Sequence, residues 1–148
     1  MIRIQAEPFD PGAELAGFAA RAPGAGAIAS FTGLVRNDSD GSEVTALELE
    51  HYPALTEKTV ATIGEDARAR FDLADLAIIH RHGAMAPGEP IVFVAAAATH
   101  RRAAFDAVDY VMDRLKTEAP FWKRERGPEG ARWIEARSVD LEDRARWG

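Results

Sequence analysis

Two lysines flank a proline in the segment LKTEAPFWKRE at 115–125. An amine can hold a negative charge, or accept a proton if burial or neighbouring cations lower its pKa. A helix that ends before Pro120 and continues as a strand would let Lys116 and Lys123 face each other across the bend. The strand period then places Lys123 and Glu125 on one face. The structural alternative is a helix end followed by an edge strand, with no chemical role.

A second segment, THRR at 99–102, follows a predicted strand and opens a predicted helix, with Thr99 as its expected cap. The free backbone N–H groups of a helix start, together with His100 and Arg101, suit an anion. Positive side chains in a first turn also oppose the helix dipole, a cost that indicates function. In a third segment, FTGLVRN at 31–37, Arg36 leaves a strand end and can bind a phosphate with both arms of its guanidinium. From the spacing alone, an exposed arginine at a strand end without a ligand is the favoured explanation of this third pattern.

His100 and Lys116 are expected on one helix, sixteen residues apart and therefore about 24 Å from each other. One small site cannot hold both from a single chain. Either there are two sites, or a symmetric dimer places His100 and Arg101 of one copy beside Lys116 and Lys123 of the other. We favour the composite site.

The 148 residues contain no cysteine, which excludes disulfides, thiolate nucleophiles and zinc sites with Cys ligands. Only three of the 18 basic residues are lysines, namely Lys58, Lys116 and Lys123. His80 and His82 share a predicted strand face, but no third ligand is evident, so we expect no metal and favour a structural or interface role. His51 fits either the core or a pocket wall.

The pattern of apolar residues predicts an α+β fold with mainly antiparallel strands and about three helices, as a single domain over 1–148. Helices are expected from Pro11 to before Pro23, from Pro53 to Asp72, and from after Thr99 to near Glu118. The runs 26–35 and 44–52 are expected to pair as strands across a polar loop at 37–42. Further strands are predicted over 2–5, 73–82 and 91–98, with a hairpin over 121–137 and a possible helix after it.

The net charge of −6 disfavours nucleic acid as a partner. Cations are concentrated late, since residues 99–137 hold nine basic and seven acidic side chains, whereas residues 1–98 hold seven and fourteen. The longest apolar run, 91–98, is too short to span a bilayer, and the first residues lack the pattern of a leader peptide. We therefore expect a cytoplasmic protein without a membrane partner.

Five segments, in chain order, carry a resemblance to a known family: FTGLVRN, LEHYPALTEK, IIHRHG, PGEPIVFVAAAATHRRAAFDA and MDRLKTEAPFWKRE. Together they closely resemble the large, catalytic subunit of molybdopterin synthase, over about residues 26–137. The resemblance implies an α/β-hammerhead fold and a homodimer that binds one small ubiquitin-like sulfur-carrier subunit at each end, as a 2:2 heterotetramer. It also implies a cytoplasmic sulfurtransferase of molybdenum cofactor biosynthesis that needs no cofactor of its own.

In that family the carrier brings sulfur as a thiocarboxylate on its C-terminal glycine. Two such sulfurs convert cyclic pyranopterin monophosphate into the dithiolene of molybdopterin. The resemblance implies that Lys116 and Lys123 are catalytic. The expected substrate-binding residues are Arg36, His100, Arg101, Phe31, Met112 and Glu125.

Two other interpretations stay open. One is a non-catalytic dimeric adaptor that binds a ubiquitin-like protein, although Lys116 and Lys123 are both present. The other is a different phosphate-ester enzyme that uses Arg36, His100 and Lys116 without a protein partner. The absence of cysteine fits the sulfur-transfer interpretation, because a sulfur-transfer enzyme without a thiol of its own must receive its sulfur from a partner.

Overall fold

The larger of two sheets forms the centre of the fold. In this computed structural model, which describes residues 1–134 and 138–148, its strand order is β1-β6-β8-β2. The strands are β1 (Ile2–Gln5), β2 (Ala27–Leu34), β6 (Asp75–Arg81) and β8 (Pro90–Ala98). Only β1 and β6 run parallel, whereas the β6–β8 and β8–β2 pairs are antiparallel. The expected mixed α+β fold with mainly antiparallel strands is confirmed.

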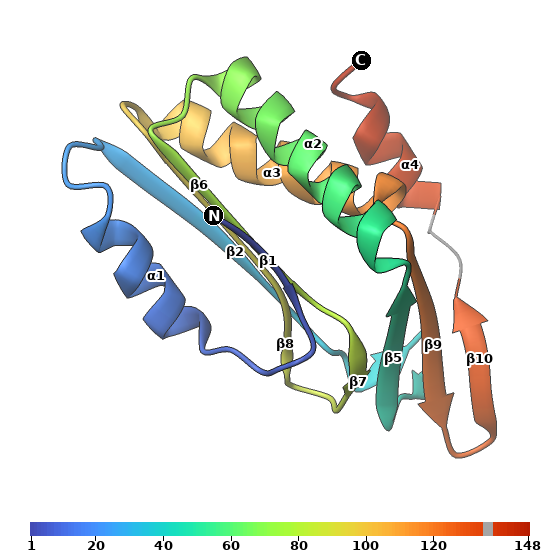
Figure 1. The fold of residues 1–148 in the computed structure, drawn as a ribbon. Helices are drawn as coiled ribbons and strands as arrows, with labels where there is room; N and C mark the ends of the chain where they lie inside the picture. Colours follow the sequence, from blue (N-terminus) through green and yellow to red (C-terminus); the bar gives the residue numbers. More distant parts are fainter. Residues whose placement is uncertain (135–137) are drawn as a thin grey trace.

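Helices cover both faces of this sheet, which explains why β8 is a continuous apolar run. Figure 1 shows α2 (Pro53–Phe71) and α3 (Arg101–Glu118) on one face and α1 (Pro11–Ala20) on the other. Along β8, Val92 and Val94 pack toward α2 and α3, whereas Phe93 and Ala95 pack toward Phe18 of α1. Small alanines at the end of β8 let the helices lie close to the strand.

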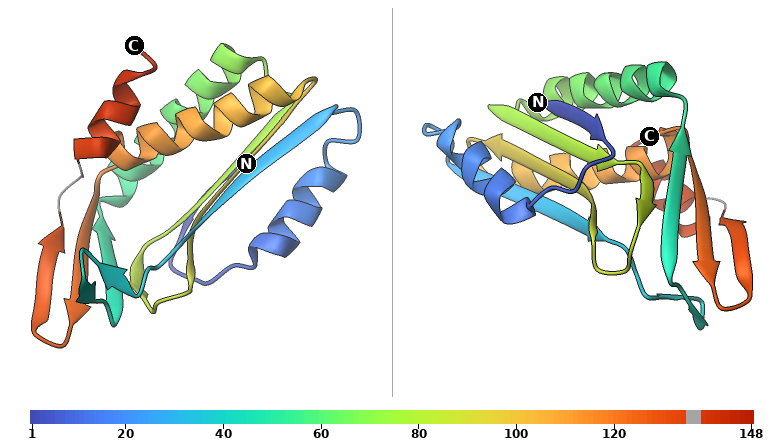
Figure 2. Two further views of the ribbon diagram at one scale, coloured as in Figure 1. Left: turned by 180° about the vertical axis from the view of Figure 1, so that it is seen from behind. Right: turned by 60° about the horizontal axis from the view of Figure 1, so that its bottom comes forward.

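A second sheet lies at one end of the first (Figure 2), with the strand order β10-β9-β5-β7 and all pairs antiparallel. Its strands are β5 (Ala46–His51), β7 (Gly83–Met85), β9 (Phe121–Gly127) and β10 (Gly130–Ile134). The face of this sheet that carries Leu47 and Leu49 is its inner face. A small core lies there, formed by Val35, Leu47, Leu49 and Met85, with Phe121 packed against it. This sheet receives the chain directly from the end of α3.

The expected pairing of 26–35 with 44–52 is wrong. Strand β2 pairs with β8, from Ala27 opposite Ala98 to Leu34 opposite Pro90, whereas β5 pairs with β7 and β9. The segment expected as a loop contains a two-stranded hairpin, β3 (Asp38–Ser39) and β4 (Ser42–Glu43), turning at Asp40 and Gly41 with positive φ at both. The chain therefore passes from one sheet to the other between two runs that looked like partners.

Thr99 does not cap α3, contrary to expectation. The N-cap is His100, whose side chain makes no capping hydrogen bond. Thr99 lies in the bend between β8 and α3, and the helix begins at Arg101. Gly26 packs closely against this bend, since a Cβ there would lie 2.1 Å from the Thr99 carbonyl oxygen. Asp10 does cap α1 as expected, accepting from the backbone N–H of Gly12 at 2.9 Å.

A fourth helix, α4 (Ser138–Ala145), confirms the possible helix of the tail and exceeds the expected number of about three. It is fixed to α3 through polar contacts. The Asp113 carboxylate accepts from Arg146 at 2.7 Å and from the indole N–H of Trp147 at 2.6 Å, and Arg144 pairs with Glu118 at 3.1 Å. The last residues of the predicted hairpin, 135–137, lie outside the described residues. No helix in the described part of the chain is long and apolar enough to cross a membrane.

Candidate active site

The bend between α3 and β9 places Lys116 and Lys123 at the junction of the two sheets. Helix α3 ends at Glu118, and Ala119 takes an extended conformation, as a residue before proline should. The backbone N–H of Phe121 donates to the Ala119 carbonyl at 2.8 Å, which closes the bend. Lys116 is exposed in the last turn of α3, and Lys123 is the third residue of β9.

Lys123 lies on the inner face of the second sheet, opposite Leu49 of β5 and Ile134 of β10. Its Nζ is 3.8 Å from Oε1 of Glu125. Burial lowers the pKa of Lys123, the Lys116 ammonium and Arg36 lower this pKa further, and Glu125 and Asp140 oppose them. The fold therefore brings Arg36, which follows β2, and both lysines into one electrostatic neighbourhood.

Glu125 is the buried acid of this neighbourhood. Its residue is 6% exposed, and its Oε2 has no hydrogen-bond partner among the described residues. Arg132 Nη2 lies 3.8 Å from that oxygen, close enough for an ion pair but not for a hydrogen bond. An open groove of about 440 Å³ between the β3–β4 and β9–β10 hairpins is lined by Glu125, Arg132 and the 41–44 turn. The carboxylate thus retains an unused acceptor beside a space accessible from solvent.

Three histidines and one phenylalanine form a cluster of rings that includes Phe121, the first residue of β9. The His80 ring stacks on the Phe121 ring at a centroid distance of 4.0 Å and an interplanar angle of 13°. The centroid of the His51 ring lies 4.4 Å from that of His82 and 5.5 Å from that of Phe121. The Nδ1 atom of His51 is 3.0 Å from the Thr56 hydroxyl oxygen. Among the described residues, no group of three or more His, Asp or Glu side chains could hold a metal ion.

His100 and Arg101 lie at the opposite end of α3, both exposed. Because α3 is unbroken over 18 residues, about 24 Å of helix separates His100 from Lys116, so one chain does not bring them together. Phe31, on the edge strand β2, is 41% exposed, and Met112 is partly buried against the larger core. His100 and Arg101 therefore do not join the two lysines within one chain, whereas Met112 lies one helical turn before Lys116 on α3.

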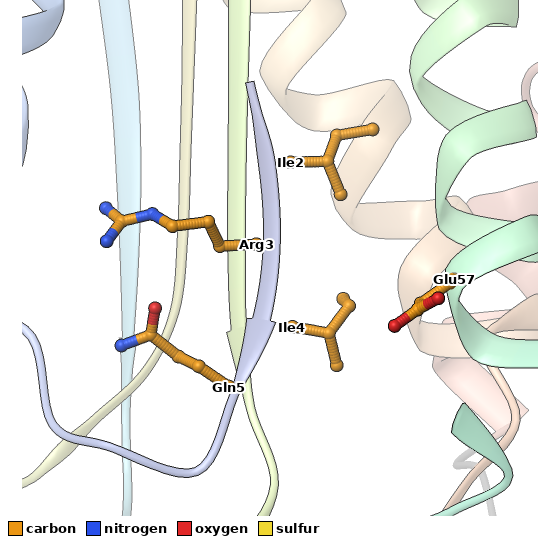
Figure 3. Close-up of a pocket in the computed structure, with 5 residues that line it drawn as sticks. All are labelled: Ile2, Arg3, Ile4, Gln5 and Glu57. Carbon is orange, nitrogen blue, oxygen red and sulfur yellow. The ribbon is translucent and has the colours of Figure 1, made fainter. Parts of the chain in front are cut away.

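Another groove, of about 520 Å³, runs along β1 and is lined by Ile2, Arg3, Ile4, Gln5 and Glu57. Figure 3 shows Ile2 and Ile4 pointing toward Glu57 of α2, and Arg3 and Gln5 pointing the other way. Arg3 forms an ion pair with Glu14 of α1. This groove follows the outer edge of a sheet and gathers no set of groups suited to catalysis, so the lysine neighbourhood remains the stronger candidate.

A family model described as MoaE protein matches residues 4–118. The chain belongs to the MoaE protein family. Its relatives include proteins named molybdopterin synthase catalytic subunit from Ralstonia nicotianae and Pseudomonas aeruginosa. The first is 52% identical over 99% of this chain and 84% of the relative, and the second is 51% identical over 99% and 97%.

A solved structure supports the same membership. The molybdopterin biosynthesis MoaE protein from Burkholderia ambifaria is 50% identical, covers 100% of this chain and 97% of its own, and has a TM-score of 0.84. The family expected from the five sequence segments is confirmed. The MoaE family model ends at residue 118, but the alignments with full-length relatives extend over nearly the whole chain, including the strand that carries Lys123.

Two residues that act on Lys123 or lie beside Phe121 were not predicted as site residues from the sequence. Asp140 lies on α4 and raises the pKa of Lys123, yet nothing in the tail distinguishes it from other acids. His80 stood out only as one of two histidines on a predicted strand. Its contact with Phe121 joins residues 41 positions apart, so no local pattern could reveal it.

Proposed function

We propose that this chain is the catalytic subunit of a molybdopterin synthase. It transfers two sulfurs from the thiocarboxylated C-terminal glycine of a ubiquitin-like carrier to cyclic pyranopterin monophosphate, which forms the dithiolene. The observation that carries the proposal is the paired Lys116 and Lys123 at the α3–β9 bend, in a chain without cysteine. Relatives about 50% identical over nearly the full length are named for this activity.

The ligands of the proposed reaction are anionic, and the neighbourhood of Lys123 is cationic. A thiocarboxylate tail and a cyclic phosphate both carry negative charge, and Lys116, Lys123 and Arg36 supply positive charge. The thiocarboxylate sulfur attacks a side-chain carbon of the pterin and displaces an oxygen substituent, so that a C–S bond replaces a C–O bond and the displaced oxygen leaves as water or as the freed end of the phosphate ester. Water then cleaves the acyl–sulfur bond and returns the carrier tail as a carboxylate. No cofactor is needed for these steps.

The two lysines receive different roles. Lys116 is exposed, and the resemblance to the family implies that it lies nearest the carrier tail, where it either moves protons as sulfur attacks or stabilises charge in the acyl intermediate. Lys123 orients the substrate and stabilises developing negative charge. Burial removes water from the Lys123 ammonium, which lowers the pKa of Lys123 and strengthens the attraction of its charge for an anion.

The site is completed by a second copy of the chain. His100 and Arg101 cannot reach Lys116 along α3, so we propose a homodimer in which they bind the substrate phosphate from the neighbouring copy. One carrier then binds at each end, giving a 2:2 assembly. Arg36, Phe31, Met112 and Glu125 complete the proposed substrate-binding set.

The test combines purified chain, thiocarboxylated carrier and pyranopterin substrate, with dithiolene formation as the readout. We expect Lys116→Ala and Lys123→Ala each to lower turnover at least about a hundredfold, and Lys123→Ala to change carrier affinity far less. Lys58→Ala is the matched control and should retain full turnover, because Lys58 is an exposed residue of α2 and is not among the charged groups that shift the pKa of Lys123. Lys116→Arg separates the two roles, since retained turnover excludes a need for a deprotonated amine.

Undiminished dithiolene formation by both alanine variants would overturn the assignment of the lysines. Binding of the carrier without any dithiolene would favour the adaptor interpretation. Turnover of the substrate without a carrier would favour a phosphate-ester enzyme instead.

A further inference from the structure

His80 lies where the first sheet meets the second. It is the penultimate residue of β6, paired with Ile4 of β1 and Val92 of β8. Its ring stacks nearly parallel on Phe121, the residue that begins β9. Phe121 is five residues after Lys116 and two before Lys123, so the stacked pair lies at the centre of the bend that connects the two amines.

The hydrogen bonding of His80 fixes its tautomer. Nδ1 is 2.8 Å from the Arg81 carbonyl oxygen, which can only accept, so Nδ1 carries the proton. Nε2 of the neutral ring therefore keeps its lone pair. Burial lowers the pKa of His80 to about 4; the Arg81 carbonyl opposes this change, while Lys116, His51 and His82 add to it. At neutral pH the ring is uncharged and adds no repulsion beside the Lys116 ammonium.

Neighbouring elements restrain the same pair from the other side. His51 of β5 lies 5.5 Å from Phe121 and is itself held by Thr56 of α2 through Nδ1. Phe121 also packs against the core of the second sheet. The bend is thus restrained by contacts from β5 and β6, and His80 supplies the stacked one.

We propose that His80 is a positioning residue: its neutral ring holds Phe121, and with it the α3–β9 bend, so that Lys116 and Lys123 stay together. The inference rests on the proposed function for its effect on turnover. It differs from that function in assigning a role to a group that touches neither substrate nor carrier. The placement of the two amines can be measured without either ligand.

The experiment uses the full chain with ¹³C-labelled lysine. Because the chain has only three lysines, the side-chain resonances of Lys116 and Lys123 can be assigned by substitution and followed by NMR. His80→Ala removes the stacked ring. His80→Phe keeps an aromatic ring against Phe121 but removes the nitrogen atoms. His82→Ala is the matched control, since it removes a neighbouring imidazole that contacts His51 and leaves the stacked pair in place.

We expect His80→Ala to shift the resonances of both lysines and to lower turnover about tenfold or more, because small displacements of reacting groups are costly. Carrier affinity should change less than about twofold, as expected when orientation rather than docking is lost. His80→Phe should restore the lysine resonances toward their original positions and retain turnover within about threefold of the parent chain. His82→Ala should match the parent in both measurements.

A folded His80→Ala chain with unchanged lysine resonances would overturn the inference, as would an equal effect of His82→Ala. A shift in the resonances that His80→Phe fails to reverse would also overturn it, because stacking would then not be the cause. If the parent chain forms no dithiolene, the proposed function fails, and the NMR comparison still decides whether His80 positions the lysines.

Discussion

At the scale of single residues, His80 is neutral in the folded chain and binds a proton more readily once the chain unfolds. Its pKa is about 4 in the fold, against an ordinary value near 6.5 for an exposed imidazole. Between these two values the unfolded chain binds more protons. The free energy of unfolding must therefore fall as the pH drops from about 6.5 to about 4, and this contribution is fully present above that window.

This contribution is at most about 3 to 4 kcal/mol, since the two pKa values differ by about 2.5 and each pKa unit corresponds to about 1.4 kcal/mol. We expect the unfolding free energy of the parent chain to fall, relative to that of His80→Phe, as the pH falls through that window. The measurement is urea unfolding at pH 8, 7, 5.5 and 4.5. Between pH 7 and 8 the difference should stay constant, and parallel curves down to pH 4.5 would contradict the assigned protonation state.

The placement of Lys123 beside Glu125 could be predicted from the sequence, whereas the stacking of His80 on Phe121 could not. Alternation along 121–126 places Lys123 and Glu125 on one face, and the ladder with Leu49 and Leu47 of β5 shows that this is the inner face. The helix break at Pro120 likewise follows from local sterics. The stack of His80 on Phe121 depends on how two sheets meet, which local periodicity does not encode.

At the scale of elements, the starts of α1 and α3 can be compared, because only the first has a side-chain cap. Asp10 accepts hydrogen bonds from the N–H groups of Gly12 and Ala13 at the start of α1, whereas Thr99 precedes the N-cap of α3 and makes no capping bond. We expect Asp10→Ala to lower the free energy of unfolding by about 1 kcal/mol and Thr99→Ala to change it by less than about 0.5 kcal/mol. Chemical denaturation measures both, and equal losses would contradict the capping assignments.

The sequence predicted which segments are helices and strands better than it predicted which strands pair. The three long apolar stripes became helices, and the run 91–98 became a strand because it is buried on both faces. The predicted pairing of 26–35 with 44–52 is wrong because these two runs, although neighbours along the chain, belong to different sheets. The close contact between Gly26 and Thr99, just before α3, involves residues 73 positions apart and has no local signature.

At the scale of the whole molecule, the composite site predicts complementation between defective chains. In a heterodimer of His100→Ala with Lys116→Ala, one site carries both lesions and the other carries neither. We expect verified heterodimers to recover about half of the parent turnover per dimer, and a random equimolar mixture about a quarter. Each homodimer alone is the control, and no recovery in verified heterodimers would contradict the composite site.

The length of α3 has a further consequence for the assembly. Its apolar stripe is packed on the first sheet, so the spacing between His100 and Lys116 is fixed by an unbroken helix held against the core. A small molecule that contacts both ends of this helix must then bridge two copies. In the proposed assembly the pterin acts as a tether, and protomer association strengthens as the substrate accumulates.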